Sequence, residues 1–195
     1  EVLDIADPRE TAATGAGALP RMRVLTAGFG GQGVLLLGSM VARTAMSHGY
    51  NVTWWPSYGP EMRGGTANCS VVLDREPIGS PMVESPDLLV AMNGPSLRKF
   101  GPTLAEGGLI LYNASIVEAV DLPAGKRAIP VMATNLANEA GSERAANAVM
   151  LGAIAALHPW FDTEAFREIL RSSFPRPELQ ELNLRAFEAG HAAVR

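Results

Sequence analysis

Cysteine is almost absent from this sequence, because Cys69 is the only one among 195 residues. A single cysteine cannot form a disulfide within the chain, and it cannot by itself hold an iron–sulfur cluster or a cysteine-rich zinc site. Charged residues are also few, at 18% of the chain, and they leave a formal net charge of −4. Nucleic acids and anionic membranes attract a basic excess, so we expect neither as a partner.

Long apolar runs are missing as well. The longest candidate, over 34–41, contains Gly38 and Ser39 and is far shorter than the roughly 18 apolar residues that a membrane-spanning helix needs. Residues 1–20 begin with acidic side chains and carry no basic segment ahead of an apolar one, which is unlike a secretory signal. We therefore expect a soluble, cytoplasmic protein.

Hydrophobic residues make up 47% of the chain, and this length is enough to bury the core of one domain. Residues 1–21 are rich in Ala, Gly, Thr and Pro without hydrophobic periodicity, so we expect a flexible N-terminal extension there. The remainder, 22–195, is predicted to be a single domain.

Strand and helix patterns alternate through the first two thirds of this domain. Short apolar or β-branched runs predict strands over 23–27, 51–55, 66–73, 87–92, 109–112 and 127–131, with helices over 34–48 and 95–100. Pro56 is expected to end the second strand. From residue 135 onward the pattern is helical, over 142–157, 162–173 and 177–194, with Ser142 and Asp162 as N-caps. This order predicts an α/β fold: three α/β/α layers, a mostly parallel or mixed sheet, a Rossmann-like opening and a helical C-terminal part.

A glycine turn follows the first predicted strand, with the sequence GFGGQG over 28–33. Such a turn lets the backbone approach a ligand closely and places free N–H groups of the following helix near an anion. A dinucleotide site would need an acidic residue about 20 positions on, where Trp54-Trp55-Pro56-Ser57 stands, and no Gly-Lys-Ser/Thr follows for a P-loop. An anion site, close packing of strand and helix, and a subunit contact all stay open.

A second candidate is the loop predicted over 57–65. It lies at the carboxyl end of the second strand, where open α/β sheets bind ligands, and it includes Tyr58, Glu61, Met62 and Arg63. The planar guanidinium of Arg63 suits a carboxylate or phosphate, and Tyr58 and Met62 suit an apolar recess on another protein. The alternative is a long connection with an Arg63–Glu61 surface pair.

Other polar residues give weaker signals. We expect the three histidines, His48, His158 and His191, to flank helix ends, where a cation is favourable, and we expect Cys69 to be a buried small residue. Asn93 and Asn113 follow predicted strands, so they either line the edge near the glycine turn or satisfy turn backbone. Glu139 and Glu143 are expected to be solvated. No acid–base pair or hydrolase triad is recognisable in the sequence.

Four segments resemble the gamma subunit of 2-oxoacid:ferredoxin oxidoreductases: AGFGGQGV (27–34), SYGPEMRGGTANCS (57–70), PIGSP (77–81) and NAVMLG (147–152). The likeness covers about residues 22–157 and is greatest to the 2-oxoglutarate and 2-oxoisovalerate branches. The indolepyruvate branch is similar at the glycine turn but differs in the second loop.

The resemblance implies a multi-subunit enzyme that decarboxylates a 2-oxoacid on thiamine diphosphate, passes electrons through iron–sulfur clusters to ferredoxin and transfers the acyl group to coenzyme A. It places thiamine diphosphate, Mg²⁺ and [4Fe–4S] clusters in partner subunits, namely alpha and beta, with a ferredoxin-like delta subunit as a further candidate. This chain would cover the active-site entrance where coenzyme A arrives, and it would carry no catalytic residue or metal. The residues implied to face that junction are Gly28, Gly30, Gly31, Gln32, Gly33, Ser57, Tyr58, Glu61, Met62, Arg63, Gly64 and Gly65.

One alternative from a different class is a stand-alone nucleotide- or anion-binding protein that uses the glycine turn itself. Activity of the isolated chain, or tight nucleotide binding by it, would favour that alternative.

Overall fold

A computed structural model describes residues 21–58, 66–118, 121–158 and 161–195. Six strands form one sheet in the order β2-β3-β1-β4-β5-β6. Their bounds are β1 Met22–Phe29, β2 Asn51–Tyr58, β3 Thr66–Asp74, β4 Leu88–Ala91, β5 Leu109–Asn113 and β6 Arg127–Val131. The predicted extension, residues 1–20, lies outside the described residues.

The sheet is mixed but mostly parallel, as predicted. β3 pairs antiparallel with both β1 and β2, whereas β1–β4, β4–β5 and β5–β6 are parallel pairs. Five strands therefore share one direction and β3 alone is reversed. No helix separates β2 from β3 among the described residues, and neighbouring strands without a crossover helix pair antiparallel.

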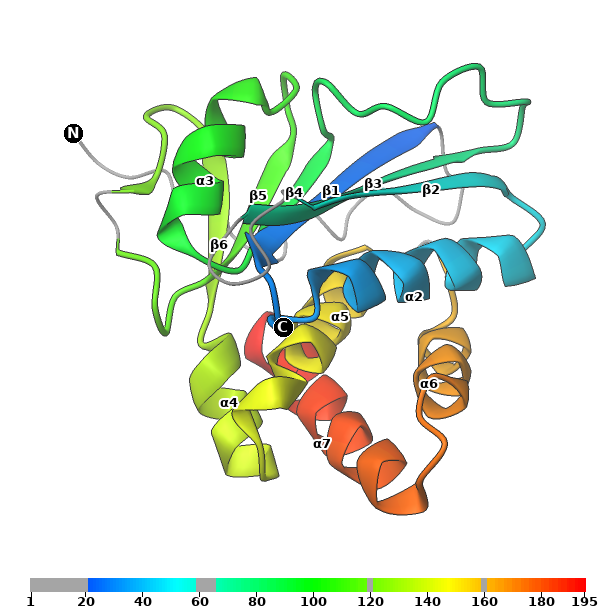
Figure 1. The fold of residues 1–195 in the computed structure, drawn as a ribbon, viewed down its shortest axis with the longest axis vertical. Coiled ribbons are helices and arrows are strands. Elements are labelled where there is room, and N and C mark those ends of the chain that lie inside the picture. The colour runs from blue at the N-terminus through cyan, green and yellow to red at the C-terminus, as the bar shows by residue number, and fades with distance from the viewer. Residues whose placement is uncertain (1–20, 59–65, 119–120, 159–160) are drawn as a thin grey trace.

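Helices cover both faces of this sheet unequally (Figure 1). One face carries α2 (Val34–Ser47), α4 (Ala133–Ala140), α5 (Ala146–Leu157), α6 (Thr163–Ser172) and α7 (Pro177–Ala193), and the other carries α3 (Gly94–Phe100). Two 3₁₀ turns, Gly101–Thr103 and Glu143–Ala145, complete the described elements.

The burial pattern explains the three layers. Alternate residues of β4 and β5 point to opposite faces and join different cores: Leu88 and Leu111 pack on the α2–α5 side, and Leu89 and Ile110 on the α3 side. Because both faces of these strands are buried, their sequences read as continuous apolar runs. The three-layer α/β/α prediction is confirmed.

The prediction that Pro56 ends the second strand is wrong. β2 continues through Pro56, which is in register with Cys69 of β3, and it ends at Tyr58. β2 is an edge strand, and proline is tolerated there because a missing N–H on the outer side breaks no ladder bond. Ser57 and Tyr58 are therefore strand residues rather than loop residues.

The helical C-terminal part is confirmed with one shift. Asp162 caps α6 as predicted, since its carboxylate accepts from the Glu164 N–H at 3.2 Å. Ser142 instead caps the short 3₁₀ turn that precedes α5, where its hydroxyl accepts from the Arg144 N–H at 3.4 Å. Helix α5 thus begins after a separate turn, and residues of that turn lie at the carboxyl edge of the sheet. No helix in the described ranges is both long and apolar enough to cross a membrane.

Candidate functional site

The glycine turn connects β1 to α2 with two residues in the left-handed region. Gly31 has φ 95° and Gly33 has φ 72°, conformations that residues with a Cβ rarely adopt. Gly33 is also the N-cap of α2 and offers no side chain to satisfy the first N–H groups of that helix. This helix end therefore has no side-chain cap of its own, and the anion interpretation of the turn stays a prediction.

Gln32 fixes the shape of the turn. Its Oε1 accepts from the Phe29 N–H at 2.7 Å and from Asn93 Nδ2 at 3.0 Å, and its Nε2 donates to the Met92 carbonyl at 3.3 Å. These bonds join the ends of β1 and β4 through one side chain. Gln32 was predicted only as a cofactor-binding residue, and the structure gives it an organising role as well.

Two of the turn glycines are required by close packing. A Cβ on Gly28 would lie 2.9 Å from the Cβ of Met92, and one on Gly33 would lie 2.6 Å from Nδ2 of Asn147. A Cβ on Gly30, in contrast, would meet no atom within 4 Å. The packing interpretation therefore holds for Gly28 and Gly33, while Gly30 and Gly31 border open space.

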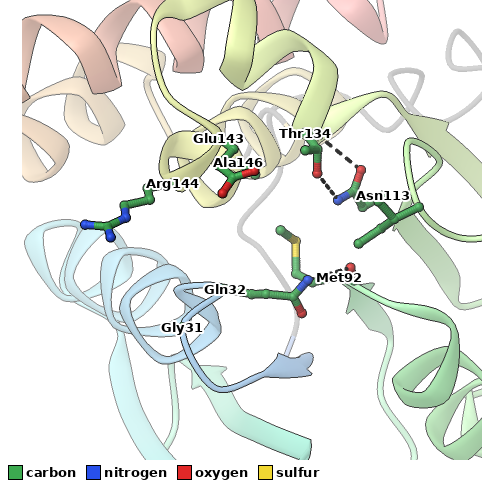
Figure 2. A pocket seen from close by; sticks show the side chains of 9 residues that line it. Gly31, Gln32, Met92, Asn113, Thr134, Glu143, Arg144 and Ala146 are labelled. Atoms are coloured by element: carbon green, nitrogen blue, oxygen red, sulfur yellow. Dashed lines mark hydrogen bonds between the residues drawn. The ribbon is translucent and has the colours of Figure 1, made fainter. Parts of the chain in front are cut away.

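A pocket of about 260 Å³ lies beside this turn, at the carboxyl edge of the parallel strands (Figure 2). Ligands of open α/β sheets bind at this edge. The wall combines residues from the glycine turn, from the ends of β4 and β5, and from the start of the C-terminal helices. It consists of Gly31, Gln32, Met92, Asn113, Ile116, Thr134, Glu143, Arg144 and Ala146.

Asn113 and Thr134 form the wall that faces Gln32 in Figure 2. Asn113 Oδ1 accepts from the N–H groups of Ser115 (3.2 Å) and Thr134 (3.3 Å), and its Nδ2 donates to Thr134 Oγ1 at 2.8 Å. Both sequence interpretations of Asn113 are thus confirmed, since it lines the edge and also satisfies turn backbone. Asn93 satisfies backbone by capping α3, where its side-chain oxygen accepts from the Ser96 N–H at 2.8 Å.

Sequence reasoning missed Thr134, Ile116 and Arg144 as pocket residues, and it treated Glu143 only as a solvated charge. Glu143 is exposed as expected, yet it lines the pocket together with Arg144. Both stand on the 3₁₀ turn Glu143–Ala145, which the sequence had placed inside a helix over 142–157. The one signal that could have found them is their position just before the NAVMLG segment.

The second candidate loop is only partly within the described residues. Ser57 is exposed at the end of the edge strand β2, and it is not among the residues that line the pocket. Glu61, Met62, Arg63, Gly64 and Gly65 lie outside the described residues. Their proposed contacts stay a prediction.

The three histidines flank helix ends as predicted. The reason given for that prediction, a favourable positive charge at a helix end, does not apply to His158. His48 and His158 are the C-cap residues of α2 and α5, and His191 lies in the last turn of α7. Burial lowers the pKa of His158 to about 3, so this imidazole is neutral near pH 7. In the part of the chain that the structure describes, no three His, Cys, Asp or Glu side chains gather in a way that could hold a metal ion.

Cys69 is fully buried in β3, as expected for a small core residue. It packs against α2, where a Cβ on Gly38 would lie 2.7 Å from its sulfur. Burial raises the pKa of its thiol to about 12, so little of the reactive thiolate exists at neutral pH.

Comparison with known proteins extends the resemblance over nearly the whole domain. The family model described as "Pyruvate ferredoxin/flavodoxin oxidoreductase" matches residues 23–193, which includes the C-terminal helices beyond residue 157. The chain is 46% identical over 173 residues to ketoisovalerate oxidoreductase subunit VorA of Methanothermobacter thermautotrophicus, a match that covers 88% of this chain and 36% of that protein. The chain thus spans about a third of the length of that relative. It is 35% identical to 2-oxoglutarate synthase subunit KorC of the same organism, covering 89% of this chain and 95% of that protein.

Solved structures give the same fold. The keto/oxoacid ferredoxin oxidoreductase gamma subunit from Geobacter sulfurreducens superposes with a TM-score of 0.79 at 31% identity, covering 90% of this chain and 97% of that one. The 2-oxoglutarate:ferredoxin oxidoreductase from Magnetococcus marinus, solved with 2-oxoglutarate, coenzyme A and succinyl-CoA bound, superposes with a TM-score of 0.81 at 26% identity over 90% of this chain and 31% of that one. The sequence match, the mixed sheet and the glycine turn agree, and this chain belongs to the pyruvate ferredoxin/flavodoxin oxidoreductase family.

Proposed function

We propose that this chain is the gamma component of a multi-subunit 2-oxoacid:ferredoxin oxidoreductase, and that it acts at the junction where coenzyme A reaches the active site. The observation that carries the proposal is the pocket between the glycine turn and the Glu143–Ala145 turn, at the ligand-binding edge of the sheet. The match to KorC supports it, because that match runs over nearly the full length of both chains.

The surroundings of the pocket favour a partner protein above it. Ile116, in the pocket wall, is 50% exposed, and Met132, just after β6, is 45% exposed. Exposed large apolar side chains are enriched at protein–protein interfaces. A subunit seated on this edge would bury both side chains and close the pocket, which matches the predicted role of covering an active-site entrance.

The redox groups would belong to other subunits. The described residues do not fit a metal or an iron–sulfur cluster, because no suitable ligand group exists among them and Cys69 is buried within the core. In the proposed complex, thiamine diphosphate, Mg²⁺ and [4Fe–4S] clusters reside in the alpha and beta subunits and a ferredoxin-like delta subunit, and ferredoxin accepts the electrons.

The proposed substrate is 2-oxoglutarate, which would be converted to its acyl-CoA. The near full-length match to a 2-oxoglutarate synthase subunit supports this choice. The 46% identity to a ketoisovalerate oxidoreductase subunit favours 2-oxoisovalerate as the second candidate.

Reconstitution tests the function directly. The chain would be produced alone and together with the thiamine-diphosphate and ferredoxin-like subunits from its own organism, and reduction of an artificial electron acceptor would be followed with each 2-oxoacid and coenzyme A. We expect activity from the complex and none from the isolated chain. Activity from the isolated chain would contradict the proposal, and tight nucleotide binding without complex formation would support the stand-alone alternative.

Arg63 is the residue proposed to contact an anionic group at the junction. A guanidinium that binds an oxyanion contributes a charge-assisted hydrogen bond. The Arg63→Ala variant loses this bond, so we expect a higher Michaelis constant for the 2-oxoacid or for coenzyme A. Arg176→Ala, an exposed arginine between α6 and α7, serves as the matched control. Unchanged Michaelis constants together with unchanged assembly would remove Arg63 from the site.

A further inference from the structure

The hydrogen bonds of β1 show which neighbour each of its residues serves. The Arg23 carbonyl accepts from the Asp87 N–H just before β4 at 2.8 Å, and the Ala27 carbonyl accepts from the Met92 N–H just after β4 at 2.8 Å. Successive residues of a strand turn their N–H and C=O groups to opposite neighbours. The odd-numbered residues of β1 therefore bond toward β4, and the even-numbered residues bond toward β3.

β3 carries this alternation to β2, the strand at the end of the sheet (Figure 1). Val71 lies opposite Val24 of β1, so it uses its N–H and C=O groups on β1. Trp54 lies opposite Val71 on the β2 side, and its N–H and C=O groups therefore point away from the sheet. The same register turns Val52 and Pro56 outward. Within the described residues, no hydrogen bond uses the backbone groups of Val52 or Trp54.

The sequence of β2 does little to protect this outer side. Its eight residues, NVTWWPSY, contain no charged side chain, although edge strands commonly carry charges, above all lysine, that prevent pairing with another strand. Trp54 and Trp55 are 43% and 54% exposed. A long, uncharged edge strand with exposed aromatic side chains is typical of a strand that pairs with another chain.

A second copy of β2 would satisfy the free groups completely. In an antiparallel pair with its two-fold axis at Thr53, Val52 of each copy lies opposite Trp54 of the other. Each of these two pairs exchanges two backbone hydrogen bonds, so every free N–H and C=O group of both residues finds a partner. Pro56 lies beyond the paired residues, and its missing N–H therefore breaks no bond in this arrangement.

The side chains also suit a two-fold axis. Such an axis brings each side chain close to its own copy, so charged residues would repel, and β2 has none. Val52 packs against the core on the α2 side of the sheet, and Trp54 shares that side because side chains alternate along a strand. Trp54 of one copy would pack on Val52 of the other, an aromatic and β-branched pair that stabilises neighbouring strands.

We propose that two copies of this chain pair through β2 and form a dimer with one continuous sheet of twelve strands, six from each copy. The inference goes beyond the proposed function, because it concerns a side of the sheet that does not form the pocket. A complex built on this dimer would contain the gamma component in pairs.

Sedimentation equilibrium and amide hydrogen exchange of the full 195-residue chain test the dimer. We expect the mass to rise with concentration from 20.6 kDa to twice that value. The amide protons of Val52 and Trp54 should exchange rapidly in the dilute monomer and slowly in the dimer. Those of Thr53 and Trp55 should exchange slowly in both states, because these residues bond to β3.

Charge variants at Trp54 test whether the partner is a second copy. Trp54→Lys and Trp54→Glu are each expected to weaken dimerisation at least about tenfold, because like charges then lie on diagonal positions across the axis. An equal mixture of the two variants should recover the dimer, since each lysine then lies near a glutamate. Met132→Lys is the control, because Met132 is 45% exposed after β6, at the opposite end of the sheet, and should leave dimerisation unchanged.

Three results would each overturn the proposal. The first is a chain that stays monomeric at all concentrations, including one whose Val52 and Trp54 amides are protected by another segment of the same chain. The second is a dimer that Trp54→Lys does not weaken although its thermal unfolding shows a retained fold. The third is a mixture of Trp54→Lys and Trp54→Glu that does not dimerise better than either variant alone.

Discussion

Gly152 of α5 and Gly190 of α7 let their two helices touch backbone to backbone. A Cβ on Gly152 would lie 1.9 Å from the carbonyl oxygen of Phe187, and a Cβ on Gly190 would lie 1.9 Å from that of Val149. Both distances are far below van der Waals contact, and the obstacles are main-chain atoms that no rotamer change can move. The crossing holds α7 against α5, whose N-terminal end adjoins the pocket.

Gly152→Ala is therefore expected to destabilise the chain strongly. The added methyl group forces the two helices apart, and overpacking of this kind costs about 3 kcal/mol of unfolding free energy. Denaturant unfolding followed by circular dichroism measures the change. The control is Gly79→Ala, because a Cβ at Gly79 meets no atom within 4 Å. Equal stability of both variants would show that the helices do not cross this closely.

Gln32→Leu is expected to loosen the glycine turn. The substitution removes the acceptor of the Phe29 N–H and the donor to the Met92 carbonyl, and a half-buried backbone group left without a partner costs about 2 kcal/mol. Gln180→Leu loses one bond, to the Phe174 carbonyl, and is expected to cost about 1 kcal/mol. Chemical denaturation compares the two, and a larger loss in Gln180→Leu would contradict the organising role of Gln32.

Cys69 is expected to resist alkylation in the folded chain. Burial raises the pKa of its thiol to about 12, so its reaction with iodoacetamide at pH 8 should be at least about a thousandfold slower than that of a free thiol. Labelling followed by mass spectrometry, with and without denaturant, measures the difference. Ser47→Cys, at an exposed position near the end of α2, provides an accessible thiol for comparison. Rapid native labelling at Cys69 would disprove its burial.

His158 is expected to make the fold less stable as the pH falls. Burial lowers its pKa to about 3, from an ordinary value of 6.5. Between these values the unfolded chain binds a proton that the folded chain does not, so stability is complete above the ordinary pKa and declines below it. The decline approaches about 1.4 kcal/mol per pH unit.

Unfolding free energies measured between pH 7 and pH 5 test this dependence. His158→Gln is expected to flatten the decline, because glutamine does not titrate. Burial also lowers the pKa of His191, so a smaller slope of the same sign remains. A slope that is identical in the wild-type chain and His158→Gln would show that His158 is not the group responsible.

The order of elements could be predicted because each depends on local patterns. The apolar runs of β4 and β5, the glycine turn and the Asp162 cap carry their signals within a few residues. The prediction that Pro56 ends the strand failed because it used a local pattern alone. Proline is tolerated in β2 because β2 is an edge strand, and edge position is a property of the whole sheet. The reversal of β3 likewise follows from which strands become neighbours.

The candidate site also combines features that local sequence predicts with contacts that depend on the tertiary structure. The sequence by itself determined the glycine turn and the strand ends that form the ligand-binding edge, because backbone conformation and hydrophobic periodicity are local. Only the tertiary structure decided that Thr134, Glu143 and Arg144 join Gln32 and Asn113 around one pocket. Thr134, Glu143 and Arg144 are more than a hundred positions from the turn in the sequence, and no local propensity encodes contacts that arise only when α4 and α5 pack on the sheet.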